Sequence, residues 1–89
     1  MTIEDLVLSR ADDHSRAELI DSLKASADAA RSIAGRSQER RRNEALGRAQ
    51  RLDRVIYFLE NDSLPSVSDL ADQALCEKAR EKLKALGQW

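Results

Sequence analysis

Apolar residues in the middle of the chain recur at the spacing of one helical face. From residue 45 onward they step by four, three, four and three positions: Ala45, Ala49, Leu52, Ile56 and Leu59. This spacing is typical of an amphipathic helix that packs against a partner helix. The helix is predicted to span about residues 38–60, from an arginine-rich beginning to the polar segment 61–63.

A second apolar stripe precedes it in the chain and consists of Leu19, Leu23, Ala27, Ala30 and Ala34. Ser15 and Glu18 before it have the spacing of a capping box, and Gly35 follows it, which predicts a helix over about 15–34. Ser37 is expected to cap the next helix. Because so short a connection places two long helices antiparallel, we predict a long helical hairpin. Small residues face each other near its turn, and leucine and isoleucine fill its wider far end.

Both ends of the chain predict further helices. A third helix is expected over about 67–86, with a capping-box spacing from Ser66 to Asp69 and a stop at Gly87. Its apolar face drifts around the helix axis, which predicts contact with two neighbours. Residues 3–10 form either a short separate helix or the beginning of the first long one, and the polar segment after them favours a break. The predicted fold class is therefore all-α, a small helical bundle, with residues 1–89 as a single domain.

Composition agrees with this fold and limits the function. The 89 residues include 13 alanines, three glycines and one proline, and aromatic residues make up only 3%, a mixture that favours helix over strand. The net charge of −1 indicates neither a polyanion nor a membrane as the main partner. Its distribution is uneven, however, because residues 36–54 carry seven arginines against three acids, while the segments on both sides are acidic.

The predicted location is the cytoplasm. The single cysteine, Cys76, has no partner for an internal disulfide, which fits a reducing compartment. The first residues lack the basic and then apolar pattern of a signal peptide. No apolar run approaches the roughly 20 residues that span a bilayer.

Enzymatic chemistry is not expected from this set of residues. His14 is the only histidine and is expected in an exposed polar break, and Cys76 is expected to act as a small buried hydrophobe. The chain contains no phosphate-binding glycine loop, no nucleophile elbow and no ligand spacing typical of a metal site. We therefore expect no cofactor, no metal ion and no small-molecule substrate.

Arginine residues form the first candidate binding surface. On the helix predicted at 38–60 they cover an arc of roughly 140°, interrupted by Glu44. One interpretation is a strip that follows the phosphates of a nucleic acid. The other is a solvated face balanced by acids of the helix predicted at 15–34 or of a partner, which we favour because the chain is acidic and no aromatic residues interleave the arginines. The candidate residues are Arg40, Arg41, Arg48, Arg51 and Arg54.

Aromatic residues form the second candidate surface. Tyr57 and Phe58 lie outside the hairpin seam, so either the other helices cover them or they are left for another protein. Leu46 lies on the same side as Tyr57, and Trp89 at the end of the chain either packs on this patch or docks elsewhere. Because aromatic residues are enriched at interaction hot spots, the leading functional hypothesis is a protein–protein interaction module. Such an adaptor, co-chaperone or antiactivator binds a partner protein or a second copy of itself, and nucleic-acid binding is the alternative.

In outline, residues 3–60 resemble the small helical co-chaperones of type III secretion. The short apolar segment Ile3-Glu4-Asp5-Leu6-Val7-Leu8 precedes the hairpin, and residues 45–59 form its second arm. The resemblance lies in the pattern of helices and does not extend to the helix predicted at 67–86. It implies a chaperone-like function as a further expectation.

Overall fold

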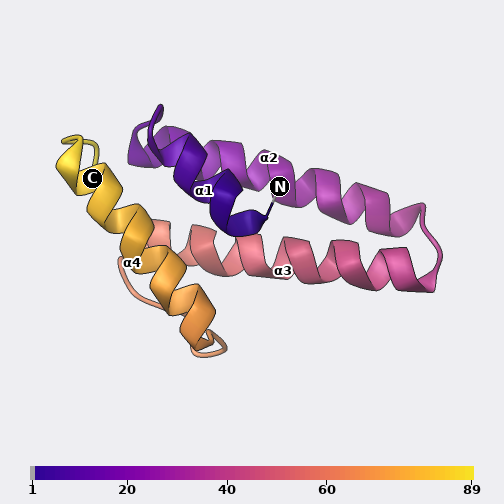
Figure 1. Ribbon diagram of the computed structural model, residues 1–89. Coiled ribbons are helices and arrows are strands. Elements are labelled where there is room, and N and C mark those ends of the chain that lie inside the picture. Colours follow the sequence, from indigo (N-terminus) through magenta and orange to yellow (C-terminus); the bar gives the residue numbers. More distant parts are fainter. Residues whose placement is uncertain (1) are drawn as a thin grey trace.

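Residues 2–89, the part of the chain that the computed structural model describes, contain four helices (Figure 1). They are α1 (Ile3–Ala11), α2 (Arg16–Gly35), α3 (Glu39–Asn61) and α4 (Leu70–Ala85). The all-α class and the α2–α3 hairpin are confirmed. The question left open at the amino terminus is also settled, because residues 12–15 leave the helical conformation and separate α1 from α2.

Side-chain caps set the beginning of three helices. Thr2 Oγ1 accepts a hydrogen bond from the Asp5 N–H, and Ser15 forms the predicted capping box with Glu18. The predicted cap of the last helix is wrong, because α4 begins at Leu70 rather than near residue 67. Its capping box joins Asp69 to Asp72, and the backbone N–H of Asp72 lowers the pKa of the Asp69 carboxyl.

The turn of the hairpin also differs from its prediction. Ser37 does not cap α3, because its hydroxyl donates to the Ile33 carbonyl at 2.6 Å and so serves the end of α2. Gln38 occupies the cap position of α3 without a side-chain hydrogen bond to the helix. Gly87 is the expected stop after α4, with a φ of 70° that favours glycine.

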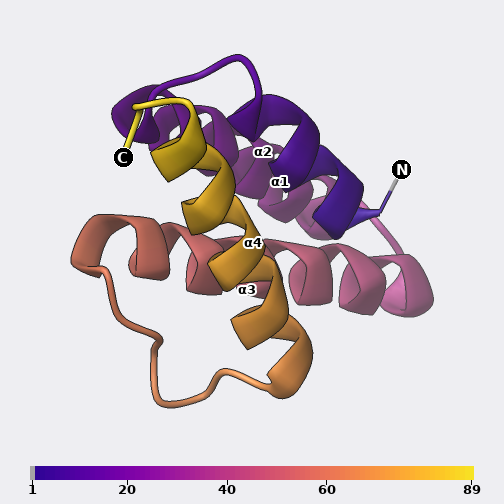
Figure 2. The ribbon, with the colours of Figure 1, turned by 60° about the vertical axis from the view of Figure 1, so that its left-hand side comes forward.

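The helices lie in two layers of unequal length (Figures 1 and 2). One layer is the hairpin, and the other consists of α1 and α4, which lie over the part of the hairpin far from its turn. Helix α4 contacts both α1 and α3, as the drift of its apolar face predicted. The main core lies between the layers and contains Val7, Ala11, Leu19, Leu23, Ala27, Leu52, Val55, Ile56, Phe58, Leu59, Leu75, Cys76, Ala79 and Leu83.

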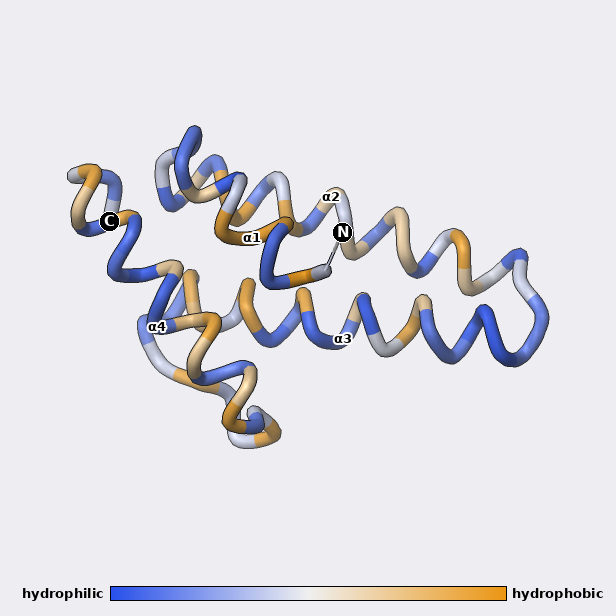
Figure 3. Tube along the Cα trace, in the orientation of Figure 1, coloured by the Kyte–Doolittle hydropathy of each residue, from blue (hydrophilic) through white to orange (hydrophobic). Residues whose placement is uncertain are grey.

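The distal half of the hairpin, defined here as residues 29–48, projects beyond the second layer. Its buried apolar residues are Ala30, Ala34 and Ala45, which belong to the predicted small-residue seam. The beginning of α3 is strongly polar, as its colour near the turn shows (Figure 3). Only alanine side chains are therefore buried where α2 and α3 pack against each other in the distal half.

Candidate functional site

Phe58 and Trp89 pack against each other at one end of the bundle. Phe58 is 3% exposed, so of the two alternatives left open by the sequence, this side chain follows the one in which the chain itself covers it. Its ring centroid lies 6.1 Å from that of Trp89, which is half-buried against the core. The guanidinium groups of Arg16 and Arg80 stack on the rings of Trp89 and Phe58 at 4.9 and 5.4 Å. The last residue thus closes the end of the bundle.

Tyr57 and Leu46 are exposed, by 45% and 37%, but they do not form one patch. They are eleven residues apart on α3, which separates them by roughly 16 Å along the helix. Asp53 lies between them and is held by Arg31, whose Nη1 is 3.0 Å from the carboxylate. The structure therefore leaves two isolated apolar residues on this side of α3, with an ion pair between them.

Arg51 and Arg54 turn toward α4 and bind a buried carboxylate. Arg54 Nε donates to Asp72 Oδ2 at 2.5 Å, and Arg51 Nε lies 3.4 Å from Oδ1. The Asp72 side chain is almost fully buried, so both cations are needed to compensate its charge. These two arginines hold α4 on α3 and are lost from the predicted strip.

The remaining arginines of the strip lie in the distal half. Arg40 Nε pairs with Glu44 at 3.7 Å, so the acid beside it belongs to α3 itself and not to α2 or a partner, where the balancing acids were expected. Arg41 is exposed and forms no ion pair within residues 2–89, and Arg48 is also exposed on the same helix. The strip predicted as one surface is thus divided between a structural contact with α4 and a basic distal half.

The two faces of the hairpin are covered by different contacts. On one face, ion pairs bridge α2 and α3: Arg31 with Asp53, and Lys24 with Glu60 at 3.3 Å. On the other face, α1 packs over the half far from the turn, with Val7 buried. Arg10 fastens α1 to α2 by donating to the side-chain hydroxyl of Ser26 at 2.7 Å.

Beyond the amino-terminal end of α1, this second face continues as a shallow groove. Two hollows that share Ile33 make it up, with volumes of about 220 and 500 Å³. Ile33 is 46% exposed, although it is one of the larger apolar side chains of α2. We call this surface the distal groove; it is lined by Leu6, Arg10, Ser26, Ala29, Ala30, Ile33, Arg36, Ser37, Arg41, Ala45 and Arg48.

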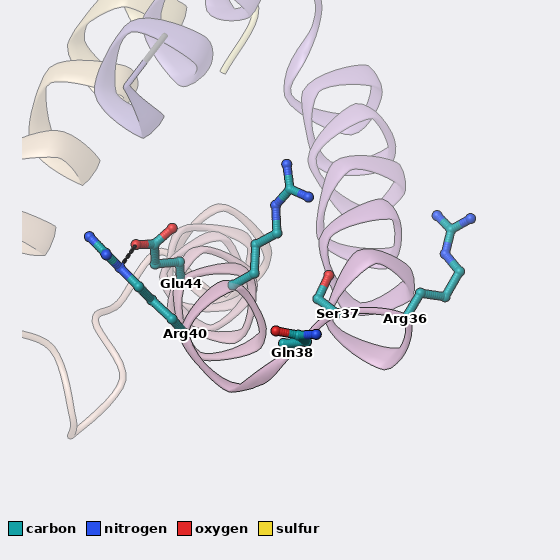
Figure 4. Close-up of a pocket in the computed structure, with 6 residues that line it drawn as sticks. Arg36, Ser37, Gln38, Arg40 and Glu44 are labelled. Carbon is teal, nitrogen blue, oxygen red and sulfur yellow. Dashed lines mark ion pairs between the residues drawn. The ribbon is translucent and has the colours of Figure 1, made fainter.

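A further hollow surrounds the turn itself (Figure 4). Arg36 extends from the end of α2, and Arg40 extends from α3 on the other side of the turn, beside Glu44. Their guanidinium groups point away from each other and do not converge on a common point. The turn therefore presents a broad basic surface rather than a closed cradle for a single anion.

Sequence reasoning missed Ile33 and Arg36 as candidate site residues. The sequence places Ile33 beside the seam, but this side chain is exposed only because α1 does not extend far enough along the hairpin to cover it. A usable signal was present, because the seam near the turn contains only alanines and leaves a large neighbouring side chain little to pack against.

The two reactive side chains have structural roles. His14 Nδ1 lies 2.8 Å from the Arg10 carbonyl, and its ring is half-buried rather than fully exposed. Cys76 is buried as expected, and burial raises the pKa of its thiol to about 12. Within residues 2–89, no group of three histidine, cysteine or acidic side chains is placed to hold a metal ion.

Comparison with protein-family models, curated proteins and solved structures finds no match to this chain. None of the helices described over residues 2–89 has the length and apolar character needed to cross a membrane.

Proposed function

We propose that this protein is a protein–protein interaction module that binds an acidic partner through the distal groove. The observation that carries the proposal is Ile33, a large apolar side chain left 46% exposed between alanines and arginines. An apolar centre with a charged rim is the usual composition of a protein interface. Adaptor, antiactivator and co-chaperone functions in the cytoplasm all require such a surface.

The charge of the distal half supports an acidic partner. Residues 29–48 contain six arginines and two glutamates, which gives +4, whereas the whole chain has a net charge of −1. Opposite charge on the partner accelerates association and selects against basic proteins. Arginine is also favoured at interfaces because its planar group binds carboxylates through two parallel hydrogen bonds.

Nucleic-acid binding is the second candidate, and the high density of arginines favours it. The strip is weaker than the sequence indicated, because Arg51 and Arg54 bind Asp72 and Arg40 pairs with Glu44. Binding of DNA or RNA would show a steep decrease in affinity with salt. Fluorescence anisotropy with mixed-sequence DNA and RNA at low salt measures this directly, and tight, salt-sensitive binding would favour this candidate over a protein partner.

Photo-crosslinking in the native host tests the proposed function. A photoreactive amino acid in place of Ile33 is expected to give a discrete crosslinked protein, and one in place of Val67, which is even more exposed at 74%, is not. Arg36→Glu with Arg41→Glu should abolish the crosslink. The control Lys24→Glu with Lys84→Glu changes the net charge equally and should preserve it. Equal crosslinking from both positions, or a crosslink that survives the arginine substitutions, would refute the proposal.

A further inference from the structure

We infer that the occupant of the distal groove is an acidic amphipathic helix that lies end to end with α1. This inference rests on the proposed function and adds the chemistry of the partner segment. Leu6 and Arg10 of α1 line the part of the groove far from the turn. The groove therefore begins where the contact of α1 with the hairpin ends. The same face of the hairpin thus already accepts one helix and remains open for another.

The floor of the groove suits a helix. Ala30 and Ala45 are buried at its base, and Ala29 lies beside them. Small side chains allow the backbone of a third helix to approach closely, within the range of roughly 8–10 Å between axes that packed helices show. Ile33 then provides a projecting side chain that fits between the side chains of the arriving helix.

The length of the groove defines the length of the segment. From Ser26 of α2 to Ser37, just past the end of this helix, the wall spans eleven residues, or roughly 16 Å, which corresponds to about three helical turns. A segment of this length presents apolar residues at positions i, i+3 or i+4, and i+7 toward the hairpin. Its acidic residues would then face Arg36 and Arg41 at the far wall.

The sparse packing of the distal half gives a physical reason for a third helix to bind there. A helical hairpin gains most of its stability from buried apolar faces, and here the seam buries only alanines. A third helix would cover Ile33 and extend the two-layer arrangement, which now ends at α1, toward the turn.

Titration with synthetic peptides tests the inference on the full chain. The probe is a peptide of about 15 residues, held helical by a side-chain lactam, with leucines on one face and glutamates beside them. A second peptide has the same composition with the leucines scattered around the helix, and a third replaces glutamate by lysine. NMR titration of the isotope-labelled protein gives both the affinity and the position of binding.

The amphipathic acidic peptide is expected to bind about tenfold more tightly than either of the other two, a difference of about 1.4 kcal/mol. Amide signals should shift at residues 26–48. Ile33→Ser, and separately Arg36→Glu with Arg41→Glu, should each weaken binding about tenfold. Val67→Ser, a matched change at another exposed apolar residue, should leave the affinity unchanged.

Several results would overturn the inference and would remain distinguishable from failure of the proposed function. Equal binding of both acidic peptides would show a contact that depends on charge alone. Concentration-dependent dimerisation in light scattering, abolished by Ile33→Ser, would identify a second copy as the occupant. Absence of peptide binding with an intact crosslink at Ile33 would refute only the acidic helix, and loss of both would refute the proposed function as well.

Discussion

The Asp72 carboxylate allows the packing of α4 on α3 to be tested by single substitutions. It accepts hydrogen bonds from the Arg54 side chain and from the Asp69 N–H, and it lies within ion-pair distance of Arg51. Asp72→Asn keeps the size of the side chain and one oxygen for the Asp69 N–H, but it removes the charge. The two arginines then lack their shared anion.

The expected loss in the free energy of unfolding is about 3 kcal/mol, the lower end of the range for breaking a buried ion pair by removing one partner. The lower end applies because both guanidinium groups reach solvent and regain part of their hydration. Asp72→Ala also removes the acceptor of the Asp69 N–H and should cost about 1 kcal/mol more. A domain of this length is expected to be stable by about 4–13 kcal/mol in total, so either change is large.

Urea denaturation followed by far-ultraviolet circular dichroism measures these losses. Trp89 fluorescence provides a second probe, since this single tryptophan packs against Phe58 in the folded chain. Asp53→Asn is the matched control, because it removes a carboxylate of α3 that also binds an arginine but is half exposed. Its loss should be far smaller, because water and salt screen an exposed pair.

A double-mutant cycle separates the ion pair from other effects of the substitution. If Arg54→Met weakens the chain as much in the Asp72→Asn background as in the natural chain, the two residues are not coupled. That result, or an Asp72→Asn loss no larger than that of Asp53→Asn, would refute the interpretation of Asp72 as the contact that fastens α4 to α3.

Other measurements follow from the same structure. Gly47 lies inside α3 with open space around it, so Gly47→Ala should raise the free energy of unfolding by about 0.5–1 kcal/mol in the same denaturation assay. Cys76 should resist labelling by a thiol reagent at neutral pH until urea unfolds the chain. Because its pKa is raised to about 12 from an ordinary 9.0, stability should decrease as the pH rises through this interval, and Cys76→Ala should weaken the decrease. Amide hydrogen exchange should be faster over residues 30–48 than over 52–59, because the distal half buries only alanines.

The hairpin could be predicted from the sequence because its determinants are local. The stripe from Leu19 to Ala34 and the stripe from Ala45 to Leu59 are each complete within one helix, and the capping box at Ser15 lies beside its own helix. Helical spacing therefore identified both arms, their direction and the small residues of their seam. The same reasoning placed α4 on two neighbours.

The beginning of α4 and the fate of the arginines could not be obtained in this way. The pair Ser66 and Asp69 and the pair Asp69 and Asp72 both have the spacing of a capping box. The structure uses the second pair, whose Asp72 also binds Arg51 and Arg54 across the interface with α3. The contact of Phe58 with Trp89 likewise joins α3 to a residue beyond the end of α4. These contacts join residues that are distant in sequence, and periodicity within one helix carries no information about them.

The division of the hairpin into two halves connects stability with the proposed function. Leucine, isoleucine and phenylalanine stabilise the half covered by α1 and α4, and Asp72 fastens the last helix there. The distal half buries only alanines, contains the exposed Gly47 and leaves Ile33 in contact with water. A stable base can hold a weakly packed arm in place while the arm remains adjustable to a partner. Substitutions that strengthen the arm from within, such as Gly47→Ala, should therefore change partner affinity without altering any residue of the distal groove.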